Sequence, residues 1–320
     1  MASCRSSFGH ASADYGDEFS GRLIAVPLDA PASTHESVLM QLELRGHSID
    51  CTDRTLVMGI VNVSYDSPIA HSIHEPNSAR DYALELVRRG AAIIDVGAHS
   101  TSTGARDMTA QEEIERVCPV ITALASEGVP ISVDTWTPAV ARAAAQAGVS
   151  LLNDVSGVTN PEMVEIVAEF QLPAIVMHMR GRPKHHHDVD QHFTDIAAEV
   201  QAFMLERAAV LEAAGSGQVW FDPGFGFGKS AEDNIRLLHG LPALVGTGYP
   251  VLISASRKGF LGELLGRGDR QDVDGLLEAT IAFNTIAAAK GVHVVRVHDV
   301  SELSDALAVV NAMRSTGGEW

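Results

Sequence analysis

From about residue 41 onward, short apolar runs alternate with longer amphipathic stretches. The apolar runs are rich in β-branched residues, which is typical of buried parallel strands. The stretches between them are rich in Ala and Glu, and their spacing predicts helices. Eight apolar runs recur along the chain: Leu56–Val61, Ala92–Val96, Val129–Val133, Leu151–Leu152, Ala174–Met177, Val219–Phe221, Val251–Ile253 and Val294–Val297.

Helix-start signals follow several of these runs. Thr109 with Glu112 has the pattern of a capping box, and Thr137-Pro138 and Asn160-Pro161 each read as an N-cap followed by Pro at the first helical position. Eight strands alternating with helices over about 250 residues match the size and order of a closed (β/α) barrel. We therefore predict an α/β protein with an eight-stranded (β/α) TIM barrel as a single domain over residues 41–320.

An open, doubly wound sheet is the alternative architecture. It normally carries a glycine fingerprint after its first strand. The sequence there reads Met58-Gly59-Ile60-Val61-Asn62, which lacks that fingerprint. The closed barrel is therefore favoured.

Residues 1–40 are rich in Ser, Ala, Asp and Gly, and we expect a flexible N-terminal extension. They do not resemble a signal peptide, and no run of 18 apolar residues predicts a membrane span. Cys4, Cys51 and Cys118 lie far apart, which favours a reduced, cytoplasmic compartment over a disulfide framework. The net charge of −18 would repel a phosphate backbone, so we expect no nucleic-acid partner.

Polar residues end nearly every predicted strand. In a (β/α) barrel the carboxyl ends of the strands meet at one mouth, where active sites form. A single polar residue after a strand often only caps the next helix, but capping explains the whole set poorly. The set consists of Asn62, Asp95, Asp134, Asn153, Asp154, His178, Asp222, Ser254, Ser256, Arg296 and His298.

Two kinds of chemistry stand out in this set. The last two strands end in Arg257, Lys258, Arg296 and His298, which predicts a cationic pocket for an anion within an acidic chain. On the other strands, two carboxylates and an amide would suit a neutral heterocycle with an N–C–N edge, because they accept hydrogen bonds from ring N–H and amino groups. These are Asp134, Asn153 and Asp222. Paired carboxylates also occur in glycosidases, but those sites are rich in aromatic residues, and only 5% of this chain is aromatic.

A glycine-rich loop runs from Asp222 to Ser230. It is not a Walker A motif, because Pro223 stands where that motif requires Gly. Its alternating Gly and Phe leave Phe227 able to cover a flat ligand. We interpret residues 185–188, three histidines and an aspartate, as a solvated loop rather than a metal site, and we expect His178 to line the pocket instead. No motif for a nucleophilic side chain is found.

The motifs together resemble the dihydropteroate synthase family, in the family's order and over about residues 41–315. Each motif is modest alone, but the ordered set is specific. The motifs are Met58-Gly59-Ile60-Val61-Asn62-Val63, Ile94-Asp95-Val96-Gly97, Ile131-Ser132-Val133-Asp134-Thr135, Asn153-Asp154-Val155-Ser156-Gly157, Met177-His178-Met179, Asp222-Pro223-Gly224, Ser256-Arg257-Lys258 and Arg296-Val297-His298-Asp299.

This resemblance implies a homodimeric barrel that joins 4-aminobenzoate to a dihydropterin carrying a pyrophosphate leaving group. It implies that Arg296 and His298 grip the pyrophosphate and that Asn62 binds its Mg²⁺. Catalysis would consist of positioning and charge stabilisation, with Lys258, Arg296 and His298 as the catalytic residues. The residues expected to bind substrate are Thr101, Asp134, Asn153, Met177, Asp222, Phe227, Lys258, Arg296 and His298.

The sequence departs from the family on one side of the expected site. Ala70 replaces an Asp of the first loop, Ser102 replaces an Arg of the second loop, and Gly259 replaces a Ser after Lys258. In the family these positions shape the aminobenzoate side, and Arg106 lies close enough in sequence to substitute for the lost Arg. The hypotheses are an ordinary synthase, transfer to a different nucleophile, or a pterin-binding paralogue that has lost the coupling step.

A methyltetrahydrofolate-dependent methyltransferase barrel is a rival of a different class. It could share the pterin-facing Asp and Asn. It has no need for the cationic grip of Lys258, Arg296 and His298, and no cobalamin-binding segment is recognisable in the sequence. A non-enzymatic pterin-binding protein is the remaining alternative.

Overall fold

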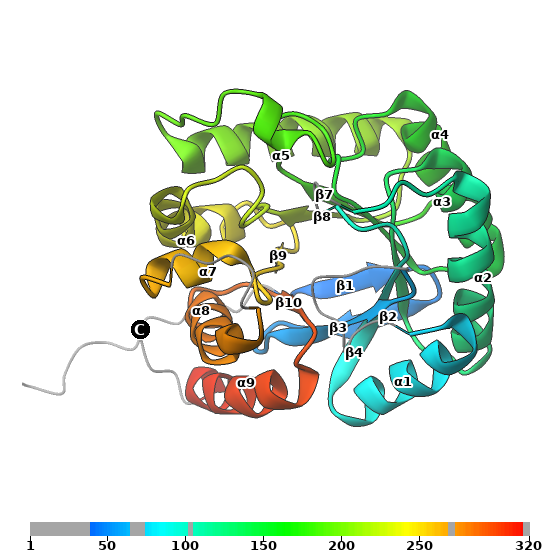
Figure 1. The fold of residues 1–320 in the computed structure, drawn as a ribbon, viewed down its shortest axis with the longest axis horizontal. Coiled ribbons are helices and arrows are strands. Elements are labelled where there is room, and N and C mark those ends of the chain that lie inside the picture. Colours follow the sequence, from blue (N-terminus) through cyan, green and yellow to red (C-terminus); the bar gives the residue numbers. More distant parts are fainter. Residues whose placement is uncertain (1–38, 65–73, 102–104, 268–272, 316–320) are drawn as a thin grey trace, which may run out of the picture. The chain divides into compact units, whose positions relative to one another are not determined.

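Eight parallel strands form a ring surrounded by helices (Figure 1). The computed structural model describes residues 39–64, 74–101, 105–267 and 273–315. The strands are β3 (Leu56–Asn62), β4 (Ala91–Gly97), β5 (Ile131–Asp134), β6 (Leu151–Asp154), β7 (Ala174–Met177), β8 (Val219–Asp222), β9 (Leu252–Ile253) and β10 (Val294–Val297).

The sheet closes on itself. Its strand order is β8-β7-β6-β5-β4-β3-β10-β9, and a parallel bridge between Phe221 and Val251 joins the two end strands. The amide of Phe221 also donates to the carbonyl of Pro250 over 2.8 Å. The predicted barrel and all eight predicted strands are confirmed, and the open-sheet alternative is wrong.

The helices lie between consecutive strands and cover the outside of the ring. Thr109 and Glu112 form the predicted capping box, and Pro138 and Pro161 begin their helices as predicted. The helices are α1 (Pro76–Arg88), α2 (Ala110–Ser126), α3 (Pro138–Ala147), α4 (Pro161–Glu169), α5 (Ile196–Ala214), α6 (Ala231–Val245), α7 (Gly259–Leu264), α8 (Leu277–Ala289) and α9 (Val300–Ser315), with short 3-10 turns η2 (His186–Asp188) and η3 (Asp274–Leu276).

A β-hairpin covers the amino-terminal ends of the barrel strands. It consists of β1 (Gln41–Leu44) and β2 (His47–Asp50). Its Leu42 and Leu44 are buried in one cluster with residues from inside the barrel, among them Trp220. The amide of Arg45 donates to the carbonyl of Ser150, just before β6. Because the hairpin fills this end, the opposite end is left to form a binding site.

The hairpin was not predicted. Leu42 and Leu44 alternate with polar neighbours, and Gly46 adopts the left-handed φ of +83° that a tight hairpin turn requires. The alternating leucines and the glycine are both visible in the sequence. Residues 1–38 lie outside the described part of the chain, so the flexible extension expected for residues 1–40 stays a prediction.

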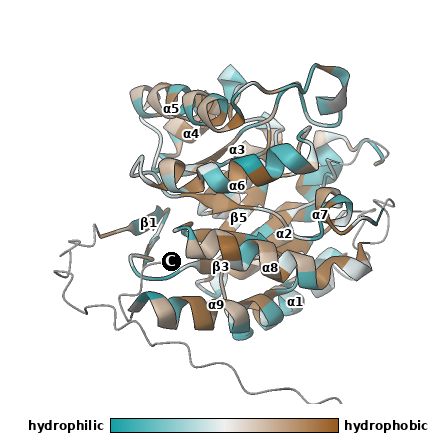
Figure 2. Cartoon of the chain, turned by 90° about the vertical axis from the view of Figure 1, so that its left-hand side faces the viewer, coloured by the Kyte–Doolittle hydropathy of each residue, from teal (hydrophilic) through white to brown (hydrophobic). Residues whose placement is uncertain are grey.

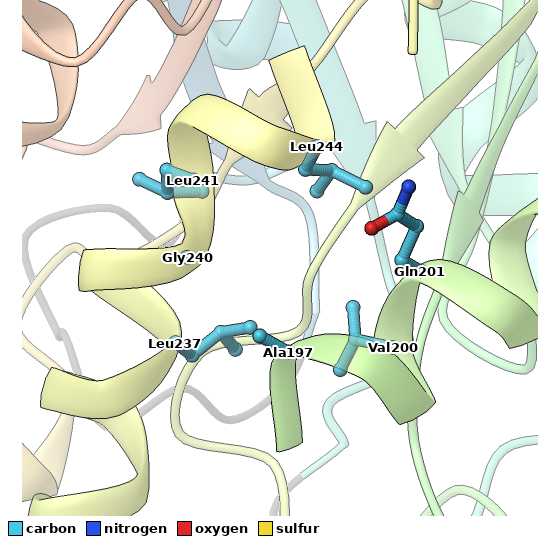
Figure 3. A pocket seen from close by; sticks show the side chains of 7 residues that line it. All are labelled: Ala197, Val200, Gln201, Leu237, Gly240, Leu241 and Leu244. Atoms are coloured by element: carbon cyan, nitrogen blue, oxygen red, sulfur yellow. The ribbon is translucent and has the colours of Figure 1, made fainter. Parts of the chain in front are cut away.

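The outer ring is tightly packed. Hydrophobic residues line the strands, while hydrophilic stretches run along outward helix faces such as that of α6 (Figure 2). Between α5 and α6 a cavity of about 10 Å³ remains, which is at the limit for a single water (Figure 3). A Cβ on Gly240 would lie 2.7 Å from the Cβ of Ala197, so this contact needs glycine. Among the described residues, no helix has the length and apolar character required to span a bilayer.

Candidate active site

The polar residues that end the strands converge at the carboxyl-terminal mouth, as predicted. Strand register places them at one level: Gly97 lies opposite Asp134, Asp134 opposite Asn153, and Met177 opposite Asp222. Residues far apart in sequence are therefore neighbours at the mouth because parallel strands end together.

Arg296 lies at the centre of this set. Its Nε donates to Asp95 Oδ2 and its Nη2 to Asp134 Oδ2, each over 2.7 Å. The Nδ2 of Asn153 lies 3.5 Å from both carboxylate oxygens of Asp95. One guanidinium from β10 thus connects the acids of β4 and β5, and the amide of β6 extends the network.

Asp95 is fully buried, and its carboxylate contacts both Arg296 and Asn153. It was noted among the strand-end residues but was not predicted to bind substrate. A charged residue within a buried apolar strand is itself a signal of such a role, because an isolated buried charge is costly.

Burial raises the pKa values of the carboxyl groups of Asp134 and Asp222. Burial raises the pKa of Asp134 to about 7, the neighbouring Asp95 adds to the rise, and Arg296 opposes it. Asp134 Oδ1 is buried and has no hydrogen-bond partner within the described part of the chain. Burial also raises the pKa of Asp222, whose Oδ1 accepts a 2.8 Å bond from the amide of Gly224. The site therefore presents a buried acceptor, Asp134 Oδ1, to a ligand N–H group.

Lys258 follows β9, which lies between β8 and β10 in the ring. Its Nζ is 3.9 Å from the centroid of the Phe227 ring, a cation–π contact. Burial and the nearby charge of Arg296 lower the pKa of Lys258 to about 8. Within the described residues Lys258 has no ion-pair partner, so its charge can be offered to an anion.

Arg257 does not belong to the cationic pocket, which corrects the prediction. Its guanidinium pairs with Asp299 over 2.8 and 2.7 Å and also donates to the carbonyl of Val273. Arg257 adopts a left-handed φ of +52°, and its amide donates to Thr280 on α8. The cations at the mouth are therefore Lys258, Arg296 and, when protonated, His298.

The remaining predicted residues lie close to this network. Met177 and Phe227 belong to an apolar cluster with Val155, Trp136 and Met179. His298 Nδ1 lies 2.8 Å from Ser256 Oγ. Asn62 and Thr101 are half-buried near the ends of β3 and β4, and Gly259 begins α7. Ala70 and Ser102 lie outside the described residues.

The prediction for His178 is wrong, and that of a solvated loop at residues 185–188 is wrong for His186, whereas His185 and Asp188 are exposed. His178 is buried between Phe193 and Phe203, with its Nε2 3.7 Å from Glu199, so it packs under α5 instead of lining the mouth. His186 is not solvated, since its ring is buried against Phe227. In both cases an aromatic neighbour distant in sequence determined the position, and the sequence pattern gave no sign of it. No group of three or more His, Cys, Asp or Glu that could hold a metal occurs among the described residues.

Lys229 is a further residue whose role was missed. It is buried, and its Nζ donates to the carbonyls of His178 over 3.1 Å and Gly224 over 2.8 Å. Burial lowers the pKa of Lys229 to about 7. These bonds tie the glycine-rich loop to the end of β7, so Lys229 holds the loop that carries Phe227.

The different surroundings of Arg257 and Lys258 yield a prediction. Arg257→Met should lower the free energy of unfolding by about 3 kcal/mol, because it leaves Asp299 half of a buried ion pair. Lys258→Met should change it by less than about 1 kcal/mol, because no ion pair is lost. Urea denaturation of both variants measures this, and an equal loss in the two would contradict the assignment.

Comparison with known proteins agrees with this geometry. Residues 58–298 match the family described as "Pterin binding enzyme". Dihydropteroate synthase of Escherichia coli is 39% identical over 282 residues, covering 86% of this chain and 97% of its own.

Solved structures agree as well. Dihydropteroate synthase of Thermus thermophilus in complex with 4-aminobenzoate superposes with a TM-score of 0.75 at 38% identity, covering 86% of this chain and 100% of that one. The Xanthomonas albilineans enzyme in complex with 7,8-dihydropteroate gives a TM-score of 0.72 at 36% identity, covering 86% and 98%. The chain therefore belongs to the pterin binding enzyme family, with dihydropteroate synthases as its relatives.

Proposed function

We propose that the protein is a dihydropteroate synthase, which condenses a dihydropterin-6-methyl pyrophosphate with 4-aminobenzoate and releases pyrophosphate. The observation that carries this proposal is one mouth that holds buried acceptors on β5 and β8 and cations on β10 and after β9. The relatives support it, since they include synthases in complex with 4-aminobenzoate and with 7,8-dihydropteroate.

The acidic side of the mouth would hold the pterin. Asp134 Oδ1 and the carboxylate of Asp222 accept from ring N–H and amino groups, and Asn153 can both donate and accept. Met177 and Phe227 would contact the faces of the flat ring, since they form the apolar part of the mouth.

The cationic side would hold the leaving group. Lys258, Arg296 and His298 would balance the negative charge that grows on the pyrophosphate oxygen as the C–O bond to the methylene carbon breaks. The amine nitrogen then forms the new C–N bond with its lone pair and loses a proton to solvent. No side chain attacks the substrate, so the protein contributes positioning and charge stabilisation.

Asn62 would help to hold Mg²⁺ at the pyrophosphate. Magnesium bound with substrate phosphates commonly takes only one or two ligands from the protein. The half-buried Asn62 side chain at the end of β3 offers an amide oxygen, so this residue fits such a site. Bound Mg²⁺ would neutralise part of the charge on the leaving group.

We also propose a cytoplasmic homodimer. Large apolar side chains are exposed at the end of α7 and just after it, on α8 and on α9, and burial against a second copy would remove them from water; they are Leu264, Leu265, Ile286, Val309 and Met313. Cys51 and Cys118 are free thiols, which suits a reducing compartment.

The coupling reaction distinguishes a synthase from a pterin-binding paralogue. We expect the wild type to form dihydropteroate and pyrophosphate in equal amounts from the two substrates. Asp134→Asn should lower kcat/KM roughly tenfold to hundredfold, because a charged hydrogen-bond acceptor for the pterin is lost. Asp81→Asn, at an exposed position on α1, is the matched control.

Tight binding of the pterin pyrophosphate without any dihydropteroate would instead identify a paralogue that has lost the coupling step. Transfer of a methyl group from methyltetrahydrofolate would support the methyltransferase rival. Chromatographic separation of the products resolves these outcomes.

Affinity for the pterin pyrophosphate should depend on pH through two groups. The Asp134 carboxylate is lost as pH falls below its pKa of about 7, and the Lys258 ammonium is lost as pH rises above its pKa of about 8. Affinity should therefore be greatest between about pH 7 and 8. Calorimetric titrations from pH 6 to 9 measure this, and Lys258→Met should lose only the alkaline limb. An affinity independent of pH would exclude both assignments.

A further inference from the structure

The turn that follows β6 has an unusual backbone. It runs from Asp154 to Val158, and its last two residues adopt a left-handed conformation, with φ of +75° at Gly157 and +54° at Val158. Glycine adopts this conformation freely, but a β-branched residue is strained in it. Val158 is also fully buried. Strain of this kind persists only where the surrounding structure imposes it, so we looked for the groups that hold Val158.

Two charged side chains hold the backbone of Val158. Asp154 accepts a hydrogen bond from the amide of Ser156 over 2.7 Å and another from the amide of Val158 over 3.2 Å. Arg207 on α5 donates to the carbonyl of Gly157 over 3.3 Å and to the carbonyl of Val158. The N–H and C=O groups of Val158 are therefore bound by side chains of opposite charge. Such charge-assisted hydrogen bonds are stronger than neutral ones.

Asp154 is an exception among the residues that end the strands, because it faces away from the mouth. It follows Asn153 on β6, and successive side chains of a strand point to opposite faces. Burial raises the pKa of Asp154 to about 6, while the bonds from Ser156 and Val158 and the charge of Arg207 oppose the rise. A fully buried carboxylate is costly unless it makes such bonds, so holding the turn accounts for its presence.

Helix α5 packs the turn against the end of β7. Phe203 and Arg207 are four residues apart and lie on one face of this helix. A Cβ on Gly157 would lie 2.8 Å from Cζ of Phe203 and 2.9 Å from the carbonyl oxygen of Met177, so this position needs glycine. The turn is therefore fixed between α5 and β7.

The first residues of the turn belong to the mouth. Val155 is buried in the apolar cluster with Met177 and Phe227, the two residues proposed to contact the faces of the pterin. Asn153 lies two residues earlier, and its amide contacts Asp95. A change in the backbone of the turn would therefore move an apolar wall of the pterin pocket and disturb the polar network beside it.

We propose that Asp154 and Arg207 are positioning residues for pterin binding. By holding the turn after β6 in its left-handed conformation, they keep Val155 in the wall of the mouth before a ligand arrives. They act through the backbone of the turn, to which both are bound. A preformed wall spares the ligand the cost of ordering the turn and so increases affinity. This inference rests on the pterin binding that the proposed function requires.

Calorimetric binding of 6-hydroxymethyl dihydropterin tests this proposal. Arg207→Met and Asp154→Asn should each lower the affinity about tenfold, as expected when a charge-assisted bond that fixes the pocket is lost. The loss should be the same for the pterin pyrophosphate, because the change affects the pocket of the ring and not the cations proposed for the leaving group.

Arg314→Met is the matched control. Arg314 is half-buried like Arg207 and also donates to a backbone carbonyl, that of Ala288, but it lies at the amino-terminal end of the barrel beside Thr55. This variant should lose stability and keep its affinity for the pterin. An equal loss of affinity in Arg314→Met would show a general effect of destabilisation and overturn the inference.

A double-mutant cycle tests whether Arg207 acts through Val155. The variant that carries both Arg207→Met and Val155→Ala should bind the pterin as weakly as Val155→Ala alone, because the wall is already lost. Circular dichroism verifies that each variant is folded at the temperature of the titration. Should Arg207→Met fail to fold, Arg207→Lys takes its place. It keeps the charge but not the planar guanidinium, so it should lower the affinity roughly threefold.

Unchanged affinity in the Arg207 and Asp154 variants, with a wild type that binds the pterin, would overturn the inference and leave the proposed function intact. Additive losses in the double variant would also overturn it. A wild type that bound no pterin would instead contradict the proposed function, and the inference would fail with it.

Discussion

The site depends on one guanidinium placed between two buried carboxylates. Asp95 and Asp134 lie on neighbouring strands, and two such charges in a low-dielectric interior would repel each other. Arg296 donates to both, so β10 is connected to β4 and β5 through charge as well as through the sheet. Removing an ion from water costs several kcal/mol, and this arrangement offsets that cost by mutual attraction. It also leaves Asp134 Oδ1 as an acceptor for a ligand.

Cationic side chains that are adjacent in sequence have different roles in this structure. Arg257 and Lys258 are adjacent in sequence, yet Arg257 turns toward Asp299 and supports the fold, while Lys258 lies over Phe227 at the mouth. The left-handed backbone of Arg257 makes this divergence possible. Lys229 is likewise a structural cation, since it ties the glycine-rich loop to β7. Charge in the sequence therefore indicates where a site is but not which cations face the ligand.

The eight strands and most of the mouth could be predicted because parallel strands are apolar runs and their ends share one rim. Side-chain direction could not be predicted in the same way. Arg257, His178 and His186 follow strands as the site residues do, but partners distant in sequence draw them elsewhere. The hairpin at residues 41–50 was missed because it lies outside the repeated pattern. Asp95 was underrated because its role rests on Arg296, which is 201 residues away.

We propose that Arg296 holds in place the acids assigned to the pterin and does not act on the pyrophosphate alone. Calorimetric binding of the bare 6-hydroxymethyl dihydropterin, which has no pyrophosphate, to wild type and Arg296→Met tests it most directly. If Arg296 holds Asp134 in place, affinity for the bare pterin should fall about tenfold or more, as expected when a buried charged network loses its centre. Unchanged affinity for the bare pterin, with loss confined to the pyrophosphate form, would contradict the account.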